Sequence, residues 1–328
     1  MKKNVLCCLT AVLLFATQAR ADNACHYVEQ ANLQLSHPAQ SSMPTVAGAI
    51  NGKPVNLLLD TGASQTSVLR EEAERQNLNP ERIQRLSQGI GGLTSVFLVK
   101  LKDFAIGDAH AKNLRFPVIE ALGHTGAAGL IGADFLMQYD VELDFANHRI
   151  KLFRADHCDE RALAYWDRNA MSVPMQLTDG SQHALVQVTI NGSTLWALID
   201  SGASISVIDL AAARQLGFAT DAPGVNYSGK ISGIGPHQRD SWRMTFDSFA
   251  IGEEVVQHPR IAVMDGGDSF LGRKPFQMIL GRDFLTAHRV LLATSQQQFY
   301  YSYNGGHVFP THQHGRQPDA AKTQQAAP

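Results

Sequence analysis

Two short segments carry the residues whose types could do chemistry. Asp60 begins the run Asp-Thr-Gly-Ala, and Asp200 begins the run Asp-Ser-Gly-Ala in the second half of the chain. Hydrolysis of an amide by water needs a base that takes a proton from the water and an acid that protonates the carbonyl oxygen and then the leaving nitrogen. Two carboxylates that share one proton can supply both functions. The two runs therefore indicate a carboxylate pair, provided that the fold brings them together.

An internal repeat surrounds the two aspartates. Residues 50–60 and 190–200 both start with Ile-Asn-Gly, and both continue through the same number of residues to two apolar residues and the aspartate. Self-similarity of this kind identifies a duplicated structural unit. Three later landmarks recur in the same order and at similar spacing: 89–91 with 233–235, 104–107 with 249–252, and 130–136 with 279–285.

The elements that must position the aspartates are mostly strands. Each Asn-Gly pair lies between two apolar runs, which is the pattern of a tight β-hairpin. We expect hairpin strands at 46–50 and 55–59 and again at 184–190 and 195–199, so that each aspartate follows a buried strand. Short helices are expected at 69–78 and 210–216.

These patterns divide the 328 residues into two lobes with flanking segments, since a single domain usually holds about 100–150 residues. From residue 304 the sequence is polar and rich in Gly, Gln, Pro and Ala, which is typical of a disordered tail. The predicted segments are a signal peptide at 1–21, an N-terminal arm at 22–43, a first lobe at 44–155, a linker at 156–170, a second lobe at 171–303 and a disordered tail at 304–328.

Together, Asp-Thr-Gly-Ala, Asp-Ser-Gly-Ala and the later apolar-apolar-Gly segment of each copy resemble the aspartic peptidases, in particular the retropepsin-like branch. The resemblance covers both lobes. It implies a mainly β fold in which two homologous β-barrel lobes form a pseudo-dimer with a central cleft. It also implies aspartic endopeptidase activity on peptide or protein substrates, with Asp60 and Asp200 as the catalytic residues.

The resemblance assigns supporting parts to neighbouring residues. The Thr61 and Ser201 hydroxyls would bond to the backbone of the opposite loop, and Gly62 and Gly202 would let the two loops approach closely. Gly132 and Gly281 would pack beneath the catalytic turns. Glycine-rich segments lie where such proteins have substrate-covering flaps: Gly89, Ile90, Gly91 and Gly92 in the first lobe, and Gly233, Ile234 and Gly235 in the second. Ordinary hairpin turns remain the alternative. In the second lobe the two interpretations are evenly balanced.

The chain also departs from the family pattern. Ser64 and Ser204 stand where retroviral enzymes carry an aspartate that pairs with the arginine of the later segment. Arg282 therefore lacks that partner, and the first copy has Ala133 in place of an arginine. We expect the two lobes to be braced in another way.

The alanines at positions 63 and 203 replace a hydroxyl residue that bonds to the outer carboxylate oxygen in pepsin-like lobes. A hydrogen bond to the charged form lowers a carboxyl pKa, so its absence makes the pair less acidic. We therefore expect an activity optimum at mildly acidic pH.

The N-terminus has the pattern of an export signal. Lys2 and Lys3 precede the apolar run 5–15, and Ala19-Arg20-Ala21 has the form of a cleavage site. The run is shorter than the ~20 residues that span a bilayer, which argues against an uncleaved anchor. We expect a periplasmic or secreted protein without membrane attachment after cleavage.

After cleavage, Cys25 and Cys158 are the two cysteines that remain. One pair of cysteines in an exported protein suggests a disulfide, with two free thiols as the alternative. Closing so long a loop stabilises a fold by roughly 4–5 kcal/mol on a chain-entropy argument, and often by less.

Composition excludes several other functions. The formal net charge is −2, and no run of Lys or Arg suggests a nucleic-acid surface. The histidines lack the spacing of a metal site, and we expect neither metal nor cofactor. Two alternatives remain open: a catalytically silent peptide- or protein-binding module, and lobes that pair between two molecules. We favour a monomeric peptidase, because two complete lobes in one chain can pair with each other.

Overall fold

The computed structural model describes residues 24–36, 43–107, 109–120, 126–159, 161–267 and 275–310. Strands make up 53% of the structure and helices 8%, which confirms the expected mainly β fold. The predicted signal peptide and the tail from residue 311 lie outside the described residues. Within the described part of the chain, no helix is both long enough and apolar enough to cross a membrane.

The first lobe is a closed barrel of six strands. The strand order is β2-β3-β8-β4-β7-β6, and the barrel closes because β2 also pairs with β6. Strand β5 pairs with the free part of β6 and extends the barrel as a long hairpin. The elements of this lobe are β2 (Thr45–Ile50), β3 (Lys53–Leu59), β4 (Ser67–Leu69), α1 (Arg70–Arg75), β5 (Glu81–Gly89), β6 (Gly92–Ile106), β7 (Ala109–Ile119), β8 (Gly129–Ile131) and α2 (Ala133–Leu136).

The second lobe follows the same path in the order β12-β13-β20-β14-β19-β16. The long strand β6 of the first lobe corresponds here to two shorter strands, β16 and β17, of which β17 pairs with β12. The elements are β12 (Ala184–Ile190), β13 (Ser193–Ile199), β14 (Val207–Asp209), α3 (Leu210–Gln215), β15 (Asn226–Ile231), β16 (Arg239–Thr245), β17 (Ser248–Ile251), β18 (Glu254–Gln257), β19 (Arg260–Met264), β20 (Met278–Leu280) and α4 (Arg282–Leu285).

The two Asn-Gly pairs form the tight turns that the sequence predicts. Asn51 and Gly52 have φ angles of 51° and 78°, and Asn191 and Gly192 have φ angles of 48° and 80°. Two successive residues with positive φ form the turn that best matches the twist of a β-hairpin. Both hairpins therefore reach the register that places an aspartate just beyond the second strand of each.

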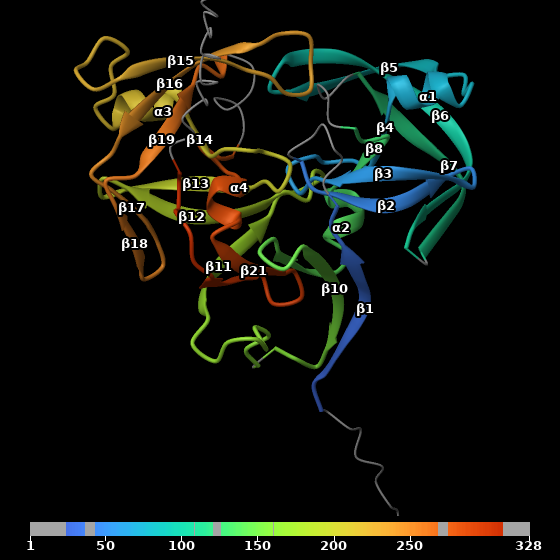
Figure 1. The fold of residues 1–328 in the computed structure, drawn as a ribbon, viewed down its shortest axis with the longest axis horizontal. Coiled ribbons are helices and arrows are strands. Elements are labelled where there is room, and N and C mark those ends of the chain that lie inside the picture. Colours follow the sequence, from blue (N-terminus) through green and yellow to red (C-terminus); the bar gives the residue numbers. More distant parts are fainter. Residues whose placement is uncertain are drawn as a thin grey trace, which may run out of the picture.

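A sheet shared by the two lobes joins them below the barrels (Figure 1). Strand β9 of the first lobe pairs antiparallel with β21 of the second, so backbone hydrogen bonds cross the boundary between the lobes. The strand order is β1-β10-β9-β21-β22-β11. Their bounds are β1 (His26–Gln34), β9 (Asp140–Asp144), β10 (Arg149–Asp156), β11 (Met171–Leu177), β21 (His288–Ala293) and β22 (Gln298–Tyr303).

A buried ion pair lies across the β9–β21 pairing. Arg289 Nη2 is 2.7 Å from Glu142 Oε1, and its Nε is 3.4 Å from Asp144 Oδ2. Glu142 is 1% exposed, and the guanidinium group covers the Trp166 ring at 4.7 Å. This brace differs from the arginine–aspartate pairs of retroviral enzymes.

The N-terminal arm belongs to the shared sheet. Strand β1 pairs with β10, and Cys25 forms a disulfide with Cys158, which confirms the predicted bond. Tyr27 also stacks on Phe153 with ring centroids 4.7 Å apart. In Figure 1, β1 lies at the opposite end of the molecule from the β5–β6 and β15–β16 hairpins.

The packed chain continues beyond the predicted start of the tail at residue 304. Phe309 is 4% exposed and packs edge-to-face against Phe249 with ring centroids 4.9 Å apart. Residues 304–310 of the predicted tail therefore belong to the described part of the chain, and the buried Phe309 ring packs this mostly polar segment against the second lobe.

Candidate active site

Asp60 and Asp200 stand at corresponding positions, each directly after a buried strand. The Asp60 amide donates to the Ile131 carbonyl at 3.0 Å, and the Gly62 and Ala63 amides donate to Asp60 Oδ1 at 3.0 and 2.9 Å. These bonds fix the orientation of the carboxylate. The second copy repeats them, from the Asp200 amide to the Leu280 carbonyl and from the Gly202 and Ala203 amides to Asp200 Oδ1.

Reciprocal hydrogen bonds lock the two turns together. Thr61 Oγ1 donates to the Ile199 carbonyl at 2.7 Å and accepts from the Ser201 amide at 3.0 Å. Ser201 Oγ donates to the Leu59 carbonyl at 2.9 Å and accepts from the Thr61 amide at 3.0 Å. Both side chains are fully buried, so the four bonds form in a poorly hydrated environment where electrostatic attraction is stronger.

Two glycines permit the close approach of the carboxylates. A Cβ atom built on Gly62 would overlap the carboxylate of Asp200, and one built on Gly202 would overlap the carboxylate of Asp60. Each carboxylate therefore lies against the backbone of the opposite turn. The structure thus brings Asp60, Asp200 and their four flanking residues into one site between the lobes.

The environment raises the pKa of both carboxyl groups. Burial is the main cause for each, and the Asp200 charge raises the pKa of Asp60 well above its usual range. Backbone N–H bonds act in the opposite direction in both copies, and a bond from the Asp60 carboxyl further favours ionised Asp200. Because two adjacent carboxylates resist ionising together, their titration belongs to the pair and not to either residue alone.

One charged side chain makes the pair asymmetric. Arg282 begins α4 in the second lobe, and its positive charge favours the ionised form of Asp200. The corresponding residue of the first lobe is Ala133 at the start of α2, which carries no charge. This difference supports Asp200 as the ionised member of the pair.

Further hydrogen bonds support each turn from below. In the first lobe, Thr66 Oγ1 donates to Asp134 Oδ1 at 2.7 Å and accepts from the Gly132 amide at 3.1 Å, while a Cβ on Gly132 would collide with the backbone of Gln65. The second lobe repeats the arrangement with Ser206, Asp283, Gly281 and Ile205.

Asp134 and Asp283 each lie in the first turn of a short helix, and the sequence did not identify their hydroxyl partners. A repeated spacing could have identified these partners, because Thr66 lies six residues after Asp60 and Ser206 lies six residues after Asp200. The two acidic groups support the turns by accepting hydrogen bonds from the amides and hydroxyls of Thr66 and Ser206.

The predicted flap segments of the two lobes meet each other. In the first lobe the β5–β6 hairpin turns at Ile90 and Gly91, and in the second lobe β15 and β16 are joined by residues 232–238. The Gly91 amide donates to the Ile234 carbonyl at 2.8 Å, and the His237 amide donates to the Gly91 carbonyl at 3.0 Å. Arg239 Nε donates to the Ile90 carbonyl at 2.9 Å, a contact that the sequence did not predict.

Each tip places an isoleucine against the other lobe. Ile90 packs against a cluster of the second lobe that contains Leu185 and Leu198. Ile234 packs against a cluster of the first lobe that contains Leu58. Leu58 and Leu198 lie two residues before the aspartates, so each tip covers the opposite half of the site.

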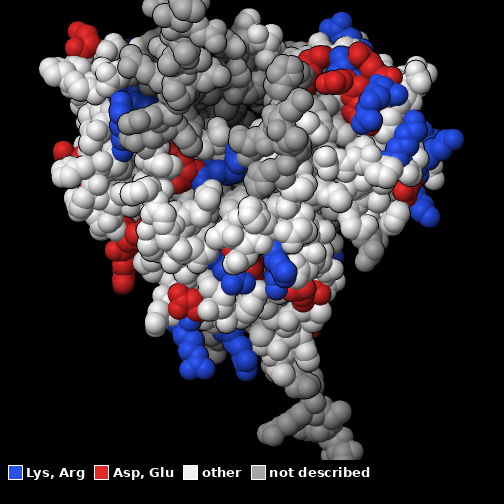
Figure 2. All heavy atoms as spheres, viewed as in Figure 1, with Lys and Arg blue, Asp and Glu red and all other residues white. Residues whose placement is uncertain are grey.

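No group of three or more His, Cys, Asp or Glu residues in the described ranges is placed to hold a metal ion. On the face shown in Figure 2, Lys and Arg lie in small groups interspersed with Asp and Glu, and most of the surface is uncharged. That face therefore offers no broad basic band.

The fold and this geometry define a class: a two-lobed β protein with a carboxylate pair held between the lobes by reciprocal hydrogen bonds. A family model described as "Aspartyl protease" matches residues 46–135 and 186–284, one region in each lobe and together more than half of the chain. The chain belongs to the aspartyl protease family. No curated protein matches the sequence.

Proposed function

We propose that the protein is an aspartic endopeptidase in which Asp60 and Asp200 act as one catalytic pair. The observation that carries the proposal is the reciprocal bonding of Thr61 and Ser201, which holds two partly buried carboxylates against each other. Such a brace has a chemical use, because two adjacent carboxylates share a proton only while they are held together.

In the proposed reaction, the ionised Asp200 takes a proton from a water molecule, and the water oxygen attacks the carbonyl carbon of the scissile amide. Asp60 donates its proton to the carbonyl oxygen, which gives a neutral tetrahedral intermediate. Asp200 then delivers the proton taken from water to the amide nitrogen, the C–N bond breaks, and one hydroxyl of the intermediate returns its proton to Asp60, so the pair again holds one proton. Positioned acid–base groups of this kind typically accelerate a reaction about 10²–10⁴-fold.

The substrate in this proposal is an extended peptide that lies beneath the joined tips. With Ile90 and Ile234 packed into opposite lobes, the tips exclude water from the carboxylates, and a peptide enters only when they separate. Closure after entry would restore a poorly hydrated site.

We also propose that the mature protein acts as a monomer in the periplasm or outside the cell. The export-type N-terminus and the Cys25–Cys158 disulfide support an oxidising compartment. The continuous sheet across β9 and β21 supports pairing of the lobes within one chain.

The test is cleavage of an unstructured peptide library by the mature protein between pH 3 and 7, with product termini identified by mass spectrometry. Asp60→Asn and Asp200→Asn should each lower the cleavage rate by at least about a hundredfold, because either change removes the shared acid–base function. The matched control is Asp221→Asn, an exposed aspartate on another loop, which should cleave like wild type.

Two outcomes would contradict the proposal. Cleavage that survives both substitutions would place the chemistry elsewhere. Retention of peptides without cleavage at any pH would support a catalytically silent binding module.

A further inference from the structure

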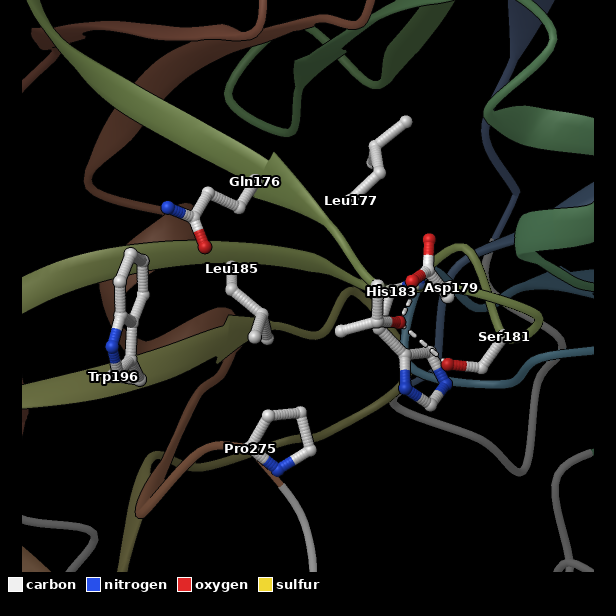
Figure 3. A pocket seen from close by; sticks show the side chains of 9 residues that line it. Gln176, Leu177, Asp179, Ser181, His183, Leu185, Trp196 and Pro275 are labelled. Carbon is white, nitrogen blue, oxygen red and sulfur yellow. Dashed lines mark hydrogen bonds between the residues drawn. The ribbon is translucent and has the colours of Figure 1, made fainter.

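A second feature of the described structure is a cavity of about 580 Å³ beside the β11–β12 hairpin of the second lobe (Figure 3). The β11–β12 hairpin supplies Asp179, Ser181 and His183 on one side, and Trp196 of β13 lies on the other. Leu185 lies between them. The volume is within the range of typical ligand sites, which is about 300–1,000 Å³.

One wall of the cavity lies on the strand that leads to Asp200, because Trp196 belongs to β13. Side chains alternate between the faces of a strand, so Trp196 and Leu198 share one face of β13, and this face leads to Asp200. Leu185 and Leu198 belong to the cluster on which the Ile90 tip packs. Four residues of strand cover about 13 Å, the length of three to four residues of an extended peptide.

The first lobe has no aromatic residue at the position that corresponds to Trp196. The Gln277 amide donates to the Trp196 carbonyl at 2.9 Å, and the Ala128 amide donates to the Asn56 carbonyl at 2.8 Å, so Asn56 occupies the position of Trp196. Gln277 Oε1 also accepts from the Trp196 amide at 3.0 Å, a bond that Ala128 cannot make. These matched positions of the two lobes therefore present different chemistry.

The lining suits a long side chain with an apolar stem and a cationic end. Leu185 is 3% exposed and forms an apolar floor, while the Trp196 ring and Pro275 offer further apolar surface. Asp179 is the one carboxylate among the described lining residues, and none of these is Lys or Arg. Methylene groups pack on aromatic and aliphatic surface while the charged end pairs with a carboxylate.

We propose that this cavity is a subsite for a Lys or Arg side chain of the substrate, three to four residues from the scissile bond, with Trp196 contacting the stem and Asp179 pairing with the charge. The proposal rests on the proposed function, since it takes the occupant to be a peptide bound across Asp60 and Asp200. An acidic side chain would face Asp179 and is excluded by like charge.

The test separates binding from cleavage. A randomised peptide library is passed over immobilised full-length Asp200→Asn protein, and the retained peptides are sequenced. Lys and Arg should be enriched at one position about fivefold over norleucine, because an exposed charge pair contributes modestly. Adding Asp179→Asn should abolish the preference for charge, and adding Trp196→Ala should weaken retention of both basic and norleucine peptides. The matched control is Asn56→Ala at the equivalent position of the first lobe, which should leave the enrichment unchanged.

The same library is then cut by the wild-type protein. Basic residues three or four positions from the cleaved bond on one side, and lost in Asp179→Asn, would support the subsite. Enrichment on the column without cleavage would sustain the subsite while contradicting the peptidase. Retention or cleavage with no basic preference, or with an aromatic preference that Asp179→Asn leaves intact, would overturn the subsite even if the peptidase stands.

Discussion

The two lobes have the same strand order and the same hydrogen bonds around their aspartates, yet they differ at two matched positions, one near the carboxylate pair and one at the cavity of the second lobe. Thr66 and Ser206 make matching bonds beneath the two turns. By contrast, Ala133 of the first lobe corresponds to Arg282 of the second, and Asn56 corresponds to Trp196.

This contrast separates two requirements of one site. Holding two carboxylates together needs symmetry, because each turn must supply the bonds that the other accepts. Orienting a peptide and assigning one proton need asymmetry, because the substrate has a direction and the two carboxylates have different parts in the proposed reaction. Variants at matched positions can test each requirement.

The largest effect is expected where the lobes join. Arg289→Met would leave Glu142 buried without its cationic partner, which typically costs about 3–5 kcal/mol of unfolding free energy. Chemical denaturation measures the change. Adding Glu142→Gln should recover part of the loss, and Arg154→Met, an exposed arginine on the same sheet, should change stability by less than about 0.5 kcal/mol. Equal losses at both arginines would show that the ion pair is not the brace.

Next come the glycines that face the opposite carboxylates. Gly62→Ala and Gly202→Ala should each lower kcat/KM by at least about a hundredfold, because displacement of a reacting group by about 1 Å has an effect of that size. Peptide hydrolysis per folded molecule is the measurement. Gly192→Ala is the matched control: its positive φ makes the substitution strained, but nothing lies within 4 Å of the added Cβ, so stability should fall and activity should not. A large loss in only one of the two glycine variants would contradict the symmetric packing.

A smaller effect is expected from the charge that distinguishes the carboxylates. Arg282 favours ionised Asp200, so Arg282→Met should raise the pKa values of the pair. Both limbs of the pH profile of kcat/KM should then move to higher pH by about 0.5–1 unit, which corresponds to about 1 kcal/mol. Arg282→Lys retains the charge and should stay close to wild type. A shift toward lower pH would contradict the proposed effect of Arg282 on the pKa values of the pair.

The smallest effect is expected at the joined tips. Arg239→Met removes the bond to the Ile90 carbonyl, which should raise KM about fivefold with little change in kcat, since about 1 kcal/mol of closure is lost. Arg82→Met is the control, because Arg82 lies on the first-lobe hairpin and bonds Ser95 of the same hairpin. If both variants change KM equally, the bond between Arg239 and Ile90 does not contribute specifically to substrate binding.

Much of the fold could be predicted from the sequence because its signals are local and occur twice. Asn51-Gly52 and Asn191-Gly192 specify tight turns by backbone conformation alone, and the apolar runs beside them specify buried strands. The duplication then indicated that Asp60 and Asp200 belong to one site. The disulfide was predictable because Cys25 and Cys158 are the two cysteines outside the predicted signal peptide.

Other contacts could not be predicted in this way. Arg239 reaches Ile90, Arg289 reaches Glu142, and Trp196 faces the β11–β12 hairpin, and none of these pairs has a recurring spacing or a counterpart in the other copy. Phe309 likewise lies in a segment whose composition indicates disorder, although its ring is buried.

The sequence by itself determined the two turns, the strands that lead into them and the residue types that can share a proton, because these depend on conformational preferences within a few residues. Only the tertiary structure decided that the positive charge of the second lobe acts on Asp200, which tip residue bonds the other tip and where a cavity opens in the second lobe. Those features depend on the packing of segments far apart in the chain, and their geometry arises only when the two barrels and the shared sheet have formed.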